Sequence, residues 1–469
     1  MKGLPRTFLR LAPLFGVRIV AMGLIFVQTL AMTRAFGAEV YGMLAFAQTA
    51  GAMALLLACF GYDKLLMRRL ARTGLDAVAA DPGWRVTLRF CLTMAGALSI
   101  TLAALGLAAF WVADLGAAYG VPLIGAAALI PLMTLRQITE ALILGTRRTV
   151  RSIMGSQIVF PLAMICGAAA AWLATDGAPG IAEATWVYVV AATLSALAAV
   201  SLLRPIIGRL RSAPGPEAPV AGDIAAAPGS GDVANAPVAG DATITPVASD
   251  IPARRTILTS GASFALVTAG FMLGPNMDVL LVGLLAGPEQ VAIVRVSARL
   301  AEAIGLIRAI AMMQYAPLLA AAHGAGDNAR LRRLVRELGL IFVVTGAPLF
   351  AAAMAFAPQA MGVFGADFVV GAPVMQIYIV GVLFTMLAGP GSTLLSMCGH
   401  EGLTARILWG ALAINLALDL ILIPIYGAVG CAIANATSLV ALGLVSAVMA
   451  VRTLGIQPSA LLTLGRRAL

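Results

Sequence analysis

Residues 89–151 read RFCLTMAGALSITLAALGLAAFWVADLGAAYGVPLIGAAALIPLMTLRQITEALILGTRRTVR. Two apolar runs, at about 90–113 and 121–144, flank a short connection that carries Asp114, and a basic loop, Arg147–Arg151, follows. Each run is long enough to cross a bilayer as a helix, which takes roughly 20 apolar residues. Cytoplasmic loops of membrane proteins carry an excess of Lys and Arg. The stretch therefore predicts a helical hairpin that begins and ends on the cytoplasmic side.

The same alternation of basic and acidic connections runs along the whole chain. Of the 31 Lys and Arg residues, 25 fall in every second connection between apolar runs, and five lie inside the apolar runs. The remaining one, Arg34, lies in one of the alternate connections, which otherwise carry acidic residues. The pattern predicts twelve spans with both termini in the cytoplasm. The expected spans are 11–33, 41–62, 90–113, 121–144, 153–174, 184–203, 257–286, 289–318, 338–357, 370–398, 404–425 and 428–451.

The composition excludes an ordinary soluble protein. Hydrophobic residues make up 61% of the chain and charged residues 11%, whereas a soluble domain is about 25% charged. The net charge of +10 fits arginines that face anionic lipid headgroups, so we expect membrane lipids and no nucleic acid as partners. The five cysteines lie apart in apolar segments without metal-ligand spacing. We expect an all-α integral membrane protein with no metal and no cofactor.

Three parts of the chain are expected. Residues 212–255 are rich in Ala, Pro and Gly, contain no aromatic residue, and repeat the hexapeptide APVAGD. Such a composition cannot bury enough surface to fold and predicts a disordered cytoplasmic linker. The linker separates an N-terminal lobe, residues 1–211, from a C-terminal lobe, residues 256–469, each with six spans.

The two lobes show signs of a repeat. GAEVYG at 37–42 joins the first two spans, and GPEQVA at 287–292 joins the seventh and eighth, 250 residues later. Six spans return the chain to its starting side, so the repeats would be parallel. Transporters with this arrangement bind substrate between two rocking halves.

Several stretches, in this order, resemble the polysaccharide-export branch of the multidrug/oligosaccharidyl-lipid/polysaccharide (MOP) exporter superfamily, which includes the O-antigen-type flippases. They are LAMTRAFGAEVYGMLAFAQTAGAMALLLACFGYDKLLMRRLA, MDVLLVGLLAGPEQVAIVRVSARLAEAI, APLLAAAHGAGDNARLRRL and LILIPIYGAVGCAIANATS. The resemblance implies two six-helix lobes around a central cavity that opens alternately to each side. It also implies a lipid carrier bearing an oligosaccharide through a pyrophosphate as the substrate. The long linker departs from the family pattern.

Charged residues inside the spans are the candidates for function, because each costs at least ~2.5–3.5 kcal/mol at mid-membrane. Arg295, Arg299 and Glu302 fall on one face of the eighth span, and Arg308 points to the other side. Arginine binds phosphate oxygens bidentately, so Arg295 and Arg299 are candidate ligands of the pyrophosphate. Alternatively, Glu302 neutralises Arg299 and the cluster joins two helices.

Two further arginines lie in the first lobe. Arg18 either lines the cavity and contacts the same anionic headgroup or extends its guanidinium to the cytoplasmic interface. Arg136 and Glu140 are four residues apart in the fourth span, which predicts a structural ion pair within one helix.

Two carboxylates in the second lobe are candidates for ion coupling. Asp278 and Asp419 are expected in the outer half of the membrane, where desolvation favours a neutral or ion-bound carboxyl group suited to H⁺ or Na⁺ exchange. Alternatively, Asp278 pairs with Arg295, and Asn415 only hydrogen-bonds Asp419.

The leading hypothesis is a flippase in the bacterial cytoplasmic (inner) membrane. It would move a lipid-pyrophosphate-linked oligosaccharide to the outer leaflet for surface polysaccharide synthesis, including lipopolysaccharide or exopolysaccharide, alongside other polysaccharide-assembly proteins. A multidrug cation antiporter of the same superfamily is the main alternative, although five intramembrane arginines outnumber four carboxylates. A membrane-bound polymerase or glycosyltransferase is the third, but the short outer loops leave no room for a catalytic domain. We therefore expect a transporter and not an enzyme.

Overall fold

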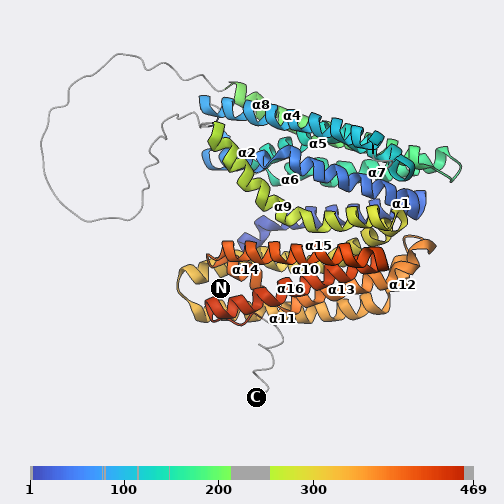
Figure 1. The fold of residues 1–469 in the computed structure, drawn as a ribbon. Helices are drawn as coiled ribbons and strands as arrows, with labels where there is room; N and C mark the ends of the chain where they lie inside the picture. The colour runs from blue at the N-terminus through green and yellow to red at the C-terminus, as the bar shows by residue number, and fades with distance from the viewer. Residues whose placement is uncertain are drawn as a thin grey trace, which may run out of the picture.

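The computed structural model describes residues 4–75, 78, 81–112, 116–146, 148–212 and 254–458. All regular secondary structure in these ranges is helical, without a strand. We call residues 4–212 the N-terminal half and residues 254–458 the C-terminal half. Most helices of the N-terminal half gather on one side of the molecule and the helices of residues 288–454 gather on the other, while the helix of residues 254–285 runs between them, beside the N-terminal half (Figure 1). The predicted linker, residues 212–255, lies outside the described part except for its terminal residues.

The N-terminal half begins with a long helix that turns back on itself. A single π-helical segment, η1, interrupts one of its later helices. The elements are α1 (Leu4–Cys59), α2 (Tyr62–Thr73), α4 (Pro82–Val112), α5 (Gly116–Gly145), α6 (Thr149–Met154), η1 (Gly155–Val159), α7 (Phe160–Ala174) and α8 (Ile181–Ser212).

The C-terminal half consists of long helices joined by short elements. A 3₁₀ segment, η2, and the short helix α12 lie together at one end. The elements are α9 (Arg254–Leu285), α10 (Pro288–Gly324), α11 (Asn328–Ala355), α12 (Ala357–Gly362), η2 (Ala366–Gly371), α13 (Ala372–Leu387), α14 (Gly391–Met397), α15 (Glu401–Tyr426) and α16 (Ala428–Leu454).

The helices have the length and surface of membrane spans. The described residues contain nine helices long and apolar enough to cross a membrane, or ten if the pair Pro288–Leu306 and Arg308–Gly324, bent by 44°, counts as one. One of the nine, Ile19–Cys59, is 41 residues long and contains a break, and α9 adds the shorter apolar helix Met272–Leu285. The prediction of a multi-pass, all-helical membrane protein is confirmed. The number of twelve spans stays a prediction.

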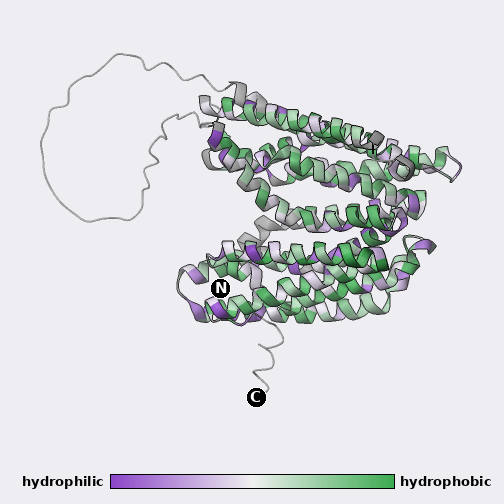
Figure 2. Cartoon of the chain, viewed as in Figure 1, coloured by the Kyte–Doolittle hydropathy of each residue, from purple (hydrophilic) through white to green (hydrophobic). Residues whose placement is uncertain are grey.

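Apolar side chains cover the outside of the bundles as well as their interior. Green, hydrophobic ribbon dominates the long helices in Figure 2, and purple, hydrophilic stretches gather near their ends. Leu173, Trp186 and Val370 are each at least two-thirds exposed. A soluble protein rarely exposes apolar patches of this extent, so the outer surface is suited to lipid.

Glycines with positive φ make the turns between consecutive helices. Gly37 (φ 76°) breaks α1, and Gly287 (φ 93°) separates α9 from α10. Glycine adopts this region at little cost because it has no Cβ. The two positions are the ones at which the sequence suggested a repeat. A second pair at the same spacing of 250 residues, Gly177 (φ 89°) and Gly427 (φ 57°), was not anticipated.

The two halves meet closely near the Gly37 and Gly287 turns, and we call this end of the molecule the Gly37 end. The opposite end, where α8 ends and α9 begins, is the linker end (Figure 1). A Cβ added to Gly42 of α1 would overlap the carbonyl oxygen of Pro288 in α10. Such close backbone approach is typical of helix packing in membranes, where small residues let neighbouring helices pack tightly. The largest cluster of buried apolar side chains therefore runs through both halves without a boundary.

Candidate functional site

A cavity of ≈ 290 Å³ lies between the two halves. The N-terminal half supplies most of its wall from α1, α5, α7 and α8, and α10 of the C-terminal half supplies two arginines. None of its lining residues in the described part of the chain is a carboxylate. The polar lining residues are Gln28, Thr29, Tyr41, Gln48, Arg136, Ser156, Tyr188, Arg295 and Arg299.

The structure places Arg295 and Arg299 in the cavity wall. One helical turn separates them on α10, so their side chains project from the same face. Arg299 donates from Nη1 to Oε2 of Glu302 at 2.8 Å, while Arg295 takes part in no ion pair among the described residues. Arg308, on the opposite face of the same helix, is exposed and does not line the cavity. The side chain of Arg18 lies outside the described part of the chain.

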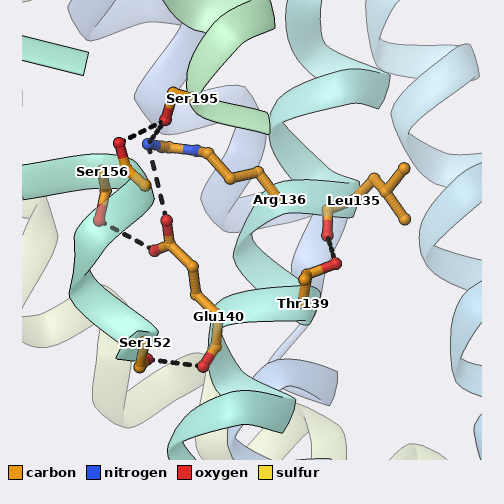
Figure 3. Close-up of polar contacts among 8 residues, drawn as sticks. Leu135, Arg136, Thr139, Glu140, Ser152, Ser156 and Ser195 are labelled. Atoms are coloured by element: carbon orange, nitrogen blue, oxygen red, sulfur yellow. Dashed lines mark hydrogen bonds and ion pairs between the residues drawn. The ribbon is translucent and has the colours of Figure 1, made fainter. Parts of the chain in front are cut away.

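Arg136 also lines the cavity, which the sequence did not predict. Figure 3 shows its polar contacts. Its Nη1 atom lies 4.0 Å from Oε1 of Glu140 and donates to Oγ of Ser195 at 3.2 Å. Oε2 of Glu140 accepts a hydrogen bond from Ser156 at 3.0 Å, and the Glu140 carbonyl accepts one from Ser152 at 2.7 Å. The ion pair thus sits inside a polar cluster drawn from α5, α6, η1 and α8.

The π-helical segment η1 positions one wall of this cluster. Ser195 donates to the Gly155 carbonyl at 2.8 Å (Figure 3). A Cβ at Gly155 would meet Oε1 of Glu140 at 3.0 Å, so only glycine allows this approach without a shift. Single π-helical turns inside α-helices are frequent at functional sites, and this one places Ser156 in the cavity wall.

The two candidate coupling carboxylates meet in a separate, buried network within the C-terminal half. Asn415 donates from Nδ2 to Oδ1 of Asp278 at 2.6 Å and to Oδ2 of Asp419 at 2.8 Å. Asn435 donates to the other oxygen of Asp278 at 2.8 Å, and Ser438 donates to the side-chain Oδ1 of Asn415 at 3.1 Å. Asn415 therefore bridges both acids, and neither acid is among the ion pairs of the described residues. The alternative pairing of Asp278 with Arg295 is absent from them.

This network has unused capacity for a cation. Asp278 and Asp419 are 2% and 0% exposed, and Oδ1 of Asp419 is buried without a hydrogen-bond partner. One atom each of Asp278, Asp419 and Cys431 lie within 4.8 Å of one another. Carboxylate and amide oxygens are ligands suited to hard cations, so the donor set fits a proton or a small hard cation better than a soft metal.

Several members of the network were missed at the level of sequence. Asn435, Ser438 and Cys431 of α16 and Tyr378 of α13 join residues of α9 and α15, and the Tyr378 hydroxyl lies 3.4 Å from Sγ of Cys431. One signal was available, because Asn435 is a lone amide in an apolar span, and such polar groups are expensive there. Its partner Asp278, 157 residues away on α9, was not visible in the sequence.

The fold is shared with known transporters. An inward-facing multidrug resistance MATE family transporter of the MOP superfamily matches with a TM-score of 0.64 at 13% identity, over 90% of this chain and 92% of that chain. Lipid II flippase MurJ in an inward closed conformation matches with a TM-score of 0.61 at 13% identity, over 93% and 87%. The MATE multidrug transporter DinF-BH in complex with R6G gives 0.56 at 15% identity, over 96% of each chain. No curated protein matches the chain.

The fold is therefore the one found in transporters of the MOP exporter superfamily. The family model described as "Polysaccharide biosynthesis protein" matches residues 12–323, and the model described as "MatE" matches residues 263–421. Because the first covers more than half of the chain, the chain belongs to the polysaccharide biosynthesis protein family. The predicted membership of the superfamily is confirmed.

Proposed function

We propose that the protein is a flippase that moves a lipid-pyrophosphate-linked oligosaccharide from the cytoplasmic to the outer leaflet by alternating access, for surface polysaccharide synthesis. The observation that carries this proposal is the charge of the cavity between the halves. Its described lining includes three arginines, Arg136, Arg295 and Arg299, and no carboxylate. Guanidinium groups bind phosphate oxygens with paired, charge-assisted hydrogen bonds, so the wall is suited to a diphosphate.

The proposed topology follows the positions of the basic residues. Counting α1 as two passes because of the Gly37 break, and α9 and the bent α10 as one pass each, gives the twelve spans of the charge pattern. The linker end then faces the cytoplasm of a bacterial inner membrane because it carries the arginine-rich connections. The Gly37 end, where the halves are in contact, faces outward.

A multidrug cation antiporter is the second candidate, and the MatE match and MATE-like fold favour it. Its cavity has to attract cations, and the only buried acidic pair we find in the described chain, Asp278 and Asp419, is not part of the cavity wall. The cavity charge favours the anionic substrate.

We assign Asp278 and Asp419 to the coupling ion. Two ionised carboxylates at this distance repel each other in a buried site, and neither has a basic partner among the described ion pairs. A proton or a Na⁺ ion would relieve that repulsion. Release of the ion would restore the negative charge at the place where α9, α15 and α16 pack together. Flipping coupled to such exchange makes or breaks no bond and requires no cofactor.

Reconstituted flipping tests the proposed function. The wild-type protein in liposomes should move a fluorescent polyprenyl-diphosphate oligosaccharide to the opposite leaflet, measured by protection from a membrane-impermeant quencher. Arg295→Gln combined with Arg299→Gln should slow flipping at least about tenfold, because each lost charge-assisted contact is worth about 1.5–3 kcal/mol. Arg308→Gln, on the same helix but outside the cavity wall, is the matched control. Transport of a cationic dye without lipid flipping would contradict the proposal.

A further inference from the structure

The Arg136–Glu140 pair is poorly formed for a buried ion pair. Its atoms are 4.0 Å apart, beyond the 2.7–3.2 Å of a hydrogen bond. Nε of Arg136 and Oε1 of Glu140 are both buried without any hydrogen-bond partner. Most buried polar atoms in proteins are hydrogen-bonded, so two unpaired atoms in a single ion pair call for an explanation.

A pair with the same residues and spacing shows what a completed contact looks like. Arg333 and Glu337 of α11 are also four residues apart, and their Nε–Oε1 distance is 3.0 Å. That pair is exposed, where a poor fit costs little, whereas Arg136 and Glu140 each retain 13% side-chain exposure. Burial of two charges stabilises a protein only when geometry and hydrogen bonds are good. Stability alone therefore does not account for the buried pair.

The surroundings of Arg136 indicate a ligand. Arg136 and Ser156 both line the cavity that Arg295 and Arg299 line from the other half. Arg136 lies nine residues before the end of α5, roughly 14 Å from the linker end, and Arg299 lies eleven residues into α10, roughly 16 Å from the Gly37 end. The first depth is measured from the linker end and the second from the Gly37 end, and a bilayer core is roughly 30 Å thick. Both arginines therefore lie near the middle of the membrane. Each also has a glutamate on its own helix, Glu140 or Glu302.

We propose that Arg136 is the N-terminal half's ligand for the substrate diphosphate, and that Glu140 is its counter-ion in the empty state, displaced when the diphosphate binds. This inference rests on the proposed function. It adds Arg136 as a further ligand of the substrate and an exchange in which the diphosphate replaces Glu140 as the partner of Arg136. The free Nε of Arg136 completes its hydrogen bonding on a phosphate oxygen. Glu140 retains the Ser156 hydroxyl after the exchange. An anion held by Arg136 and by the α10 arginines joins the two halves, so it favours the state in which they approach.

Binding to the purified protein in nanodiscs tests the exchange, with a short polyprenyl diphosphate and the matching monophosphate as probes. Arg136→Gln should weaken diphosphate binding at least about tenfold. Glu140→Gln should tighten it about threefold or more, because the competing carboxylate is gone. Arg333→Gln and Glu337→Gln, the exposed pair of equal spacing, should leave both affinities unchanged. A purely structural pair has no reason to yield a gain of affinity when one partner is neutralised.

A second substitution at the same position tests the inference if the first variant does not fold. If Arg136→Gln does not give a monodisperse protein, Arg136→Lys keeps the charge but lacks the planar fork, and it should lose the preference for diphosphate over monophosphate. Folded Glu140→Gln protein with unchanged or weaker binding overturns the inference. If diphosphate binding in that case still depends on Arg295 and Arg299, the proposed function stands without the inference on Arg136 and Glu140. A wild-type protein that binds neither probe overturns both.

Discussion

Nε of Arg34 in α1 donates to the carbonyl oxygen of Val363 at 2.7 Å, across 329 residues of sequence, and so joins the two halves at the Gly37 end. Nη2 of the same side chain lies 3.4 Å from the Gly362 carbonyl oxygen. These carbonyls end the short helix α12, and the last carbonyls of a helix have no partner within it and carry partial negative charge. The single basic residue that breaks the charge alternation thus has a specific contact.

Loss of the Arg34 contact should open the Gly37 end. We expect Arg34→Gln to shift the ratio of closed to open molecules by roughly two- to tenfold, since the net contribution of a typical hydrogen bond is about 0.5–1.5 kcal/mol. Spin labels at the exposed positions 39 and 367, in a background without native cysteines, would report the change as longer distances between the halves. Arg333→Gln, which bonds only within α11, is the control. Identical distance distributions would show that Arg34 does not hold this end closed.

Gly42 should tolerate no side chain. Its Cβ would overlap the Pro288 carbonyl, and backbone atoms cannot move aside as a flexible side chain does. Overpacking of this kind typically costs about 1–3 kcal/mol, so Gly42→Ala should lower the thermal unfolding temperature in detergent. Gly23→Ala, in the same helix with nothing within 4 Å, should leave it unchanged or raise it. Equal stability of the two variants would contradict the close approach of α1 and α10.

The Tyr119 hydroxyl makes a second contact between the halves. It donates to the Gly283 carbonyl at 2.6 Å, while the ring stacks on Phe46 at 4.2 Å. Tyr119→Phe keeps the ring and removes only the hydroxyl, so we expect a loss of about 1 kcal/mol in the free energy of unfolding. Chemical unfolding followed by tryptophan fluorescence measures it. The Arg34→Gln and Tyr119→Phe losses should be close to additive because they share no partner. A strongly non-additive double variant would point to a single cooperative gate.

Neutralising either buried acid should abolish ion coupling. We expect Asp278→Asn and Asp419→Asn to remove the dependence of flipping on a Na⁺ or H⁺ gradient. If the wild type has a higher unfolding temperature in NaCl than in choline chloride, both substitutions should remove this difference. An ion present at about a hundred times its dissociation constant stabilises a protein by about 2.7 kcal/mol, so the effect on the unfolding temperature is measurable. Asp367→Asn, an exposed acid, is the control. Gradient-independent wild-type flipping would remove the coupling role.

Part of the candidate site was accessible from residue types alone. Arg295 and Arg299 were singled out because a charge inside an apolar run needs a reason, and both line the cavity. The same argument identified Asp278 and Asp419, yet it left open whether they act together. Arg136 was assigned a local partner because Glu140 lies one turn away, and that spacing concealed its place in the cavity wall.

The order of residues was enough to predict that the chain crosses a membrane many times as helices and to locate the charged residues inside the spans. These properties are local, because insertion depends on the apolar length of each segment and on the basic residues beside it. The packing of the helices brings Asp278, Asn415, Asp419 and Asn435 into one network and places Arg136 in the same cavity wall as Arg295. In lipid, helices associate through shape, close backbone approach and hydrogen bonds and not through hydrophobicity. The contacts to Asp278 join residues more than a hundred positions apart, and no periodicity in the sequence records them.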